Sequence, residues 1–504
     1  MAKLHLAFAT LLCGMSLTAA SQDVIIEEFE GPSTLFQYDL RDLIRNGMPA
    51  GPSLVRQQAD EEEEEADTTK EALTYQERIT NMPEYLHAFI DKYVEAGQAV
   101  LDGGTSWLSD PKEGEYESNA YFFLVNEETE SVDFTFEQGS TSDAIKKAAQ
   151  KAVQKKTAPK IDTLNSFLPY AFLCANYDHP EIFWIGNNFM FGTSTSLSLR
   201  YNATGTGTAT YVLRAKFVLR TSDFDIRSNG YNNYDFRQPR NIVAGVQRFF
   251  ETRDNILKIC QKKRSTYYKL LAAHDWIIQH NCYNRYFNAN TTPESLGNMP
   301  WCPLSALEGN SNNLQSPVCE GYARAMKVLC DAMGIPCILM AGNAFEPLLH
   351  QMEAHMWNYV QVNDSTWCAL DATWDDPSVS GVNTPISGFE SHDWFLLGSD
   401  SPLPGDITFI ESHPEQWPNG YENKGTLVWE TTSWPKLSSD RWRPDPYDPN
   451  GDAVTDKQDI QLMAKAIVNN GEDIEDVDDN GRISVGDLVR MIIRYITSSE
   501  ETGE

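Results

Sequence analysis

The stretch from Ser316 to Pro377 constrains this chain more than any other, because it places a cysteine, a histidine and an aspartate in three kinds of predicted local structure. Cys319 begins a run whose apolar residues fall at helical spacing, and a Gly-Ile-Pro sequence ends that run. His355 leads an alternating strand, and a turn connects it to a return strand over Trp367–Thr373 that contains Asp371. A helix start must therefore fold close to a pair of strands if the three side chains are to meet.

These residue types have a chemical reason to meet. A thiol in the first turn of a helix faces unpaired N–H groups and the positive end of the helix dipole, which favour the thiolate. A histidine beside it completes an ion pair, and a carboxylate behind the imidazole fixes its tautomer. The turn predicts a hairpin in which Val362 pairs with Thr366. In that register Asp371 lies opposite Trp357, so it shares a face with His355 one diagonal step away.

Four short motifs occur in order along the stretch. They are Val318-Cys319-Glu320-Gly321-Tyr322-Ala323, Gly334-Ile335-Pro336-Cys337, His355-Met356-Trp357-Asn358 and Asp371-Ala372-Thr373-Trp374-Asp375-Asp376-Pro377. Together they resemble the transglutaminase-like superfamily, and in particular its bacterial secreted branch. The resemblance implies a papain-like α+β core in which Cys319 is the nucleophile, His355 the base and Asp371 the orienting acid. It implies no cofactor for catalysis.

The reaction expected of such a site is acyl transfer through a thioester on Cys319, as in a cysteine protease or acyltransferase. With water as the acceptor, the result is hydrolysis of a peptide or amide bond in a protein or peptide substrate. With lysine as the acceptor, the same thioester cross-links proteins. A non-catalytic module that binds peptide or glycan is a further alternative. Trp301 and Asn313 are candidates for a second oxyanion donor beside the N–H of the nucleophile, and the sequence does not choose between them.

Three other histidines are ranked below His355. His274 precedes Asp275 in a predicted helix, but adjacent helix positions point in different directions, so we interpret His274 as a packed or capping residue. His392 and His413 each lack a following strand with a carboxylate. The segment around His392, Ser391–Leu396, is predicted to be a closing strand of the core.

The first residues are typical of a secretory signal peptide, predicted over residues 1–20. Lys3 supplies the positive charge, an apolar run follows from Leu4 to Leu17, and Thr18-Ala19-Ala20 offers a small-residue cleavage site. The run is too short for a membrane span, and no later stretch approaches one. We therefore expect a secreted or cell-surface protein without a transmembrane anchor.

Charge and cysteine content exclude two classes of protein. The formal net charge is −32, from 40 basic and 72 acidic residues, which argues against nucleic acid or an anionic membrane as the ligand. Nine cysteines, one of them in the predicted signal peptide, are too few for a disulfide scaffold of this length. No disulfide pair is assigned.

The chain is predicted to be modular, with an α+β fold before and within the catalytic core. An acidic leader or linker, or alternatively a prosegment, precedes the folded part. In the N-terminal domain, a helical stripe at Leu86–Tyr93, a helix at Ala144–Lys156 and five short strands are expected. The predicted divisions are 21–74 for the leader, 75–240 for the N-terminal α+β domain, 241–410 for the transglutaminase-like catalytic domain, 411–447 for a Pro- and Trp-rich connector, and 448–497 for a tail.

The tail contains two acidic loops, each followed by a run at helical spacing, 460–468 and 488–496. Oxygen side chains at the first, third, fifth and twelfth positions of such a loop suit a seven-coordinate calcium ion. The duplication resembles a dockerin, a small module that binds a cohesin partner, and so implies structural Ca²⁺ and a cohesin-like partner. The candidate ligands are Asp448, Asn450, Asp452, Asp456 and Asp459 in the first loop, and Asp476, Asp478, Asn480 and Asp487 in the second.

Overall fold

The computed structural model describes most of the chain. The predicted signal peptide and the acidic run at 60–65 lie outside the described residues. The described residues are 25–39, 71–79, 84–101, 120–221, 225–226, 234–235, 239–284, 286, 299–309, 316–346, 351–376, 385, 390–414, 432–449, 454–469, 474–477 and 482–502.

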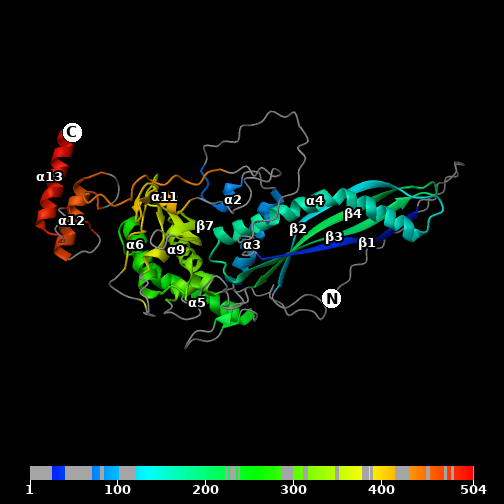
Figure 1. Cartoon of the computed structure of the whole chain (residues 1–504), viewed down its shortest axis with the longest axis horizontal. Coiled ribbons are helices and arrows are strands. Elements are labelled where there is room, and N and C mark those ends of the chain that lie inside the picture. Colours follow the sequence, from blue (N-terminus) through cyan, green and yellow to red (C-terminus); the bar gives the residue numbers. More distant parts are fainter. Residues whose placement is uncertain are drawn as a thin grey trace, which may run out of the picture. The chain divides into compact units, whose positions relative to one another are not determined.

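The chain mixes helices and sheets, as the sequence predicts, and divides into two compact units (Figure 1). Unit 1 comprises residues 1–34, 126–161 and 192–215, and unit 2 comprises the rest. This division differs from the predicted domain boundaries at 75 and 240. Helix α4 (Ser142–Asp178) continues 22 residues beyond the helix predicted to end at Lys156, and its residues fall in both units. Its last turns are held by tertiary burial, because every residue from Tyr170 to Tyr177 is buried.

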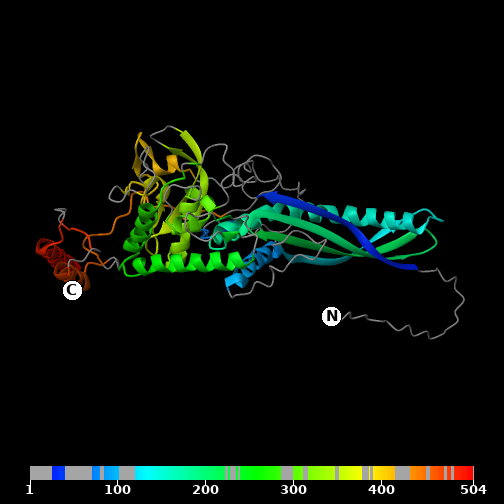
Figure 2. The same ribbon diagram turned by 90° about the horizontal axis from the view of Figure 1, so that it is seen from below.

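Unit 1 is built on a four-stranded sheet in the order β1-β3-β4-β2, with α4 running along it (Figure 2). The strands are β1 (Ile25–Asp39), β2 (Ala120–Thr135), β3 (Ile185–Tyr201) and β4 (Thr206–Thr221). Two expectations were wrong here. The leader predicted over 21–74 contains β1, whose Phe29 packs against the core of this unit, and the five short strands are three long ones.

A tight turn joins β3 and β4 into a hairpin. Asn202 N–H donates to the carbonyl of Thr206 at 3.1 Å, and Gly205 adopts a positive φ of 96°. The unit 1 core lies between this hairpin and the first turns of α4. Its buried members are Phe134, Ile145, Ala149, Val153, Leu197, Leu199, Tyr201, Ala209, Tyr211 and Leu213.

Unit 2 surrounds one buried helix, α9 (Cys319–Met333). Two long helices, α5 (Pro239–Cys260) and α6 (Thr266–His280), precede it in the chain. The other elements before the tail are α2 (Tyr75–Arg78), α3 (Glu84–Leu101), β5 (Asp225–Ile226), β6 (Tyr234–Asp235), η1 (Met299–Trp301), α8 (Pro303–Leu307), β7 (Cys337–Glu346), β8 (Gln351–Gln361), β9 (Trp367–Leu370), α10 (Ala372–Asp375), β10 (Pro402–Leu403), β11 (Ile407–Thr408) and α11 (Phe409–Ser412).

Helix α9 begins and ends where the sequence predicts. Every residue from Gly321 to Cys330 is buried, which makes α9 the central helix of the unit. Gly334 ends it in the left-handed conformation, with a φ of 72°. Gly321 permits the close approach of η1, since a Cβ at that position would lie 2.5 Å from the carbonyl oxygen of Pro300.

Buried polar side chains fix α9 to its neighbours. Arg324 pairs with Glu320 at 2.9 Å and donates to the carbonyl of Asn176 at the end of α4, at 3.0 Å. Asn358 on β8 donates to the carbonyl of Ala323 at 2.9 Å. These groups are satisfied in a region without water access, so moving the helix relative to β8 would leave buried donors unpaired.

The sheet β7-β8-β9 has the register that the sequence predicts. Val362 N–H donates to the carbonyl of Thr366 at 2.9 Å, and Asn358 pairs with Leu370. The return strand is shorter than expected, because Asp371 leaves the ladder to cap the four-residue helix α10.

The closing strand predicted at Ser391–Leu396 was wrong. That segment forms turns, and pairing with β9 is limited to an isolated bridge between Ala369 and Leu397. The Ser391 hydroxyl accepts from Asp393 N–H at 3.0 Å, a local bond that competes with a strand ladder.

The tail has the two helices expected after its loops, α12 (Lys457–Asn469) and α13 (Val485–Thr502). They pack around a small core whose buried members are Met463, Ala466, Ile474 and Met491. Among the described residues, no helix has the length and apolar character to cross a membrane.

Candidate active site

His355 and Asp371 form the closest contact of the site. His355 Nε2 lies 2.6 Å from Asp371 Oδ2, and both side chains are buried. The other carboxylate oxygen, Oδ1, accepts from the backbone N–H groups of Thr373 at 2.9 Å and Trp374 at 3.3 Å. The helix turn that Asp371 caps therefore holds its carboxylate in place while Oδ2 faces the imidazole.

The electrostatics of this pair favour charge on both partners. Burial lowers the pKa of His355, but the charge and hydrogen bond of Asp371, with a further hydrogen bond from Cys319, outweigh burial and raise it to about 10. Burial also raises the pKa of Asp371, but the same partner and His413 hold it well below its usual range. At neutral pH the pair is an imidazolium and a carboxylate.

Cys319 occupies the first position of α9 and is half-buried. Asp371 engages Nε2 of His355, so Nδ1 is the ring nitrogen left for the hydrogen bond with Cys319. No side chain caps the start of this helix at Val318. The positive helix end and an imidazolium therefore both act on the sulfur.

Tyr283 is a neighbour of Cys319 that the sequence did not indicate. Its hydroxyl accepts from the backbone N–H of Cys319, and burial together with the thiol's charge raises the pKa of Tyr283 well above its usual value. A neutral hydroxyl thus lies at the amide that an oxyanion would use. Of the two predicted donors, Trp301 is buried in η1, and Asn313 lies outside the described residues.

His413 was ranked low on the sequence, yet it lies against the same carboxylate. Its Nε2 is 3.4 Å from Asp371 Oδ2, and its ring stacks on Phe409 at 4.5 Å. Burial lowers the pKa of His413 to about 4, so it is a neutral donor. The capping box of Thr408 and Glu411 indicates the start of α11 in the sequence. No sequence pattern, however, indicates that His413 at the end of this helix contacts Asp371, 42 positions earlier.

Aromatic rings enclose the charged pair. Trp374 stacks on His355 with ring centroids 4.6 Å apart and planes at 20°, and Trp357 meets His413 edge-on at 4.8 Å. These rings fix the plane of the imidazole and keep water from the Oδ2–Nε2 bond, which strengthens it.

The turn after Asp371 is anchored from behind. His274 Nε2 lies 3.1 Å from Asp375 Oδ2, and both residues are fully buried, so His274 is packed as predicted. The Tyr322 hydroxyl of α9 donates to Asp376, whose pKa burial raises to about 7. In the described part of the chain, two groups offer metal-ligating atoms within 4.8 Å of one another: His355, Asp371 and His413, and His274, Asp275 and His392.

Comparison with protein families identifies the fold around this site. Residues 255–372 match the family model of the transglutaminase-like superfamily. The matched region includes α6, α9, β7 and β8, and it contains Cys319, His355 and Asp371. The chain contains a transglutaminase-like domain. No curated protein matches the chain.

Among solved structures, a proposed cysteine protease from Cytophaga hutchinsonii is similar at 15% sequence identity, over 55% of this chain and 74% of that one. Its TM-score of 0.17 is too low to support an argument.

The predicted calcium ligands are described only in part. Asp487 is buried and accepts from the N–H groups of Val477 at 3.0 Å and Ser484 at 2.7 Å. Asp459, also buried, accepts from Asp456 N–H at 2.8 Å. Asp448, Asp456 and Asp476 are partly exposed, and Asn450, Asp452, Asp478 and Asn480 lie outside the described residues.

Removing the imidazole of His355 should slow the alkylation of Cys319 more than replacing the carboxylate of Asp371 does. His355→Ala is expected to lower the iodoacetamide rate at pH 7 by roughly tenfold or more, because it removes the imidazolium that favours the reactive thiolate. Asp371→Asn should lower the rate less, since it weakens the orientation of His355 without removing the ring. Peptide mapping of the alkylated protein measures the rate at each thiol.

His280→Ala is the matched control, because His280 lies on α6 and pairs with the carbonyl of Trp276. Cys319 in His280→Ala should be alkylated at the same rate as in the unmodified protein. Equal rates in His355→Ala and the unmodified protein would contradict the assigned pair.

Proposed function

We propose that this protein is an exported thiol enzyme that hydrolyses peptide or amide bonds through a thioester on Cys319. The observation that carries the proposal is the 2.6 Å bond between His355 and Asp371 beside a thiol at a helix start. The buried carboxylate keeps the imidazole charged and oriented, which is what a thiolate nucleophile requires.

The chemistry follows from the positions of the three groups. The Cys319 thiolate attacks the carbonyl carbon, and the oxyanion replaces the Tyr283 hydroxyl as the acceptor of the Cys319 backbone N–H. His355 gives its Nδ1 proton to the leaving amine, which breaks the C–N bond and leaves an acyl thioester. His355 then accepts a proton from water as the water oxygen attacks the thioester carbon, and the C–S bond breaks to release the carboxylic acid and regenerate the Cys319 thiolate beside the imidazolium. Asp371 stays ionised throughout and stabilises the imidazolium.

Cross-linking of proteins is the second candidate function, and it differs from hydrolysis only in the molecule that accepts the acyl group. A lysine amine attacking the same thioester would produce an isopeptide bond, and the sulfur, imidazole and carboxylate would act identically. A non-catalytic module that binds peptide or glycan is the alternative from another class. The buried contact between His355 and Asp371 favours an enzyme, because burying two charges costs free energy and binding a peptide or glycan does not require it.

Export and surface assembly complete the proposal. The signal-like first 20 residues support secretion, and the duplicated acidic loops of the tail support a calcium-loaded, dockerin-like module that binds a cohesin-like partner. The catalytic unit would then be delivered to a protein assembly outside the cell.

Cys319→Ala should abolish turnover while leaving the free energy of unfolding nearly unchanged, because it removes one half-buried sulfur. The measurement uses a fluorogenic peptide library, with and without an added primary amine. Release of free acid indicates hydrolysis, and incorporation of the amine indicates transfer. Cys282→Ala is the control, since Cys282 is the other half-buried thiol among the described residues. Turnover that survives Cys319→Ala would rule out the thioester mechanism.

The tail should fold when it binds calcium. Without a cation, its carboxylates repel one another, and the small core around Met463 and Met491 buries too little apolar surface to compensate. We expect residues 448–497, expressed alone, to be largely unfolded in chelator and helical with calcium. Calorimetry and circular dichroism measure both changes.

In the full-length protein, Asp487→Asn should weaken calcium binding more than Asp459→Asn does, because the second loop has Gly481 where the first has Ala453 and is therefore expected to be the tighter site. Glu501→Gln, outside both loops, is the control. Full helicity of residues 448–497 in chelator, or no heat on adding calcium, would refute the calcium module.

A further inference from the structure

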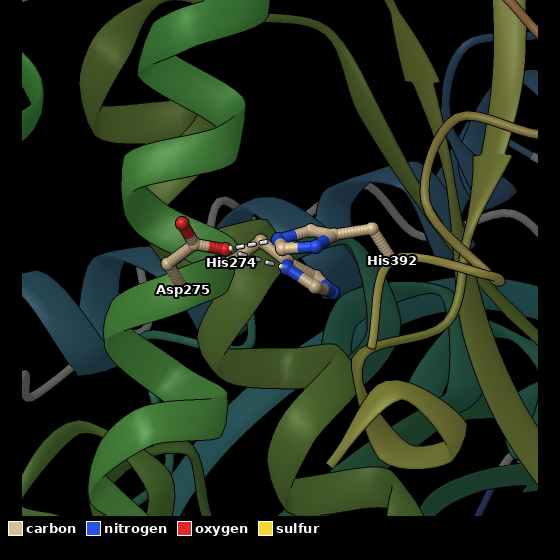
Figure 3. Close-up of side chains that lie close together, drawn as sticks. All are labelled: His274, Asp275 and His392. Carbon is tan, nitrogen blue, oxygen red and sulfur yellow. Dashed lines mark hydrogen bonds and ion pairs between the residues drawn. The ribbon is translucent and has the colours of Figure 1, made fainter. Parts of the chain in front are cut away.

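A second cluster of ligand-type side chains lies behind the catalytic turn. His274 and Asp275 come from α6, and His392 comes from the turn segment that precedes Trp394. Figure 3 shows both imidazoles directed at one carboxylate oxygen of Asp275. His392 Nε2 is 2.7 Å from this oxygen, and His274 Nδ1 is 3.3 Å from it. Two elements far apart in the sequence therefore bring two nitrogens and one oxygen to a common point.

The far side of His274 is held as metal-bound histidines are held. Its Nε2 lies 3.1 Å from Oδ2 of Asp375, a fully buried carboxylate. A carboxylate that accepts the N–H of one ring nitrogen leaves the lone pair on the other, and it raises the basicity of that nitrogen. Here the other nitrogen is Nδ1, the one directed at Asp275.

The spacing and exposure of the three groups suit a small divalent cation. Zinc bonds nitrogen and oxygen at about 2.0–2.1 Å in a tetrahedron, which separates neighbouring ligand atoms by about 3.3 Å. His274 and Asp275 already have this separation, and His392 is 43% exposed, so it can withdraw by the required fraction of an ångström. Asp275 is 28% exposed, which leaves a path from solvent for the ion and for a water ligand.

We propose that His274, Asp275 and His392 bind one zinc-class divalent cation, with water as the fourth ligand and Asp375 orienting His274. The cation would join α6 to the segment at Trp394. That segment is bonded to the catalytic turn at two points: Trp394 N–H donates to Asp375 Oδ1 at 3.0 Å, and its carbonyl accepts from Asp371 N–H at 3.1 Å. The ion therefore stiffens the support of Asp371 and takes no part in the reaction.

Cobalt and zinc titrations of the full-length protein test this site. The protein is stripped with chelator, kept reduced, and supplied with excess calcium so that the tail loops are filled. One equivalent of Co²⁺ should bind with weak visible absorption and without the strong thiolate-to-cobalt band that cysteine ligation would produce. Zinc should displace it and raise the Tm.

Variants assign the ligands. His392→Ala and Asp275→Asn should each weaken binding at least tenfold and remove the zinc-dependent rise in Tm. Asp375→Asn should weaken binding by about 10–100-fold, through the orientation of His274. His280→Ala, on the same helix and outside the cluster, should bind like the unmodified protein.

Three outcomes would overturn the proposal. They are the absence of any bound cobalt, a thiolate band that accounts for all of the binding, and affinity unchanged in His392→Ala. Each would leave the cluster as an ion pair in which a proton, and not a metal, joins His274 to Asp275. Because His392 is largely exposed, its replacement leaves the fold intact and the comparison decisive.

Discussion

The bond from His355 Nε2 to Asp371 Oδ2 is the interaction on which the candidate active site of unit 2 depends. It is buried, it is only 2.6 Å long, and both partners carry charge. A buried pair of this kind stabilises little by itself, because removing two charges from water offsets most of their attraction. The pair instead keeps His355 charged and holds its ring in a fixed plane, so that Nδ1 is left to bond Cys319. The aromatic rings of Trp374 and Trp357, and the neutral donor His413, are arranged around that requirement.

Two kinds of structure keep this pair and the thiol together. Helix α9 is buried over most of its length, and polar anchors such as Asn358 bond it to β8, the strand that carries His355. The hairpin register then sets the distance from His355 to Asp371, and the bonds of Asp375 to His274 and Trp394 hold the following turn. A small movement of any one element would break several buried hydrogen bonds at once, so the arrangement is stiff.

The local parts of this arrangement could be predicted from the sequence, and the long-range parts could not. The helix start at Cys319, its end at Gly334 and the register through Val362 follow from spacing, glycine conformation and strand alternation. The contact of His413 with Asp371, and the extension of α4 to Asp178, depend on tertiary burial that no local pattern encodes. Strand β1 was missed for a related reason. Its neighbour in the sheet is β3, which lies far away in the sequence, so no local pattern indicates the pairing. Ser391–Leu396 has apolar residues at strand-like positions, yet local hydrogen bonds make it a turn.

The central claim is that His355 is an imidazolium at neutral pH because Asp371 holds it so. Nitrogen-15 NMR of histidine-labelled protein tests this directly, with His355→Gln used to assign the signal among nine histidines. The account predicts that both ring nitrogens of His355 stay protonated at pH 7 and lose a proton only as the pH approaches about 10. In Asp371→Asn, the pKa should fall, because the attraction that raises it is removed. A neutral ring at pH 7 in the unmodified protein, or the same pKa in both proteins, would contradict the account.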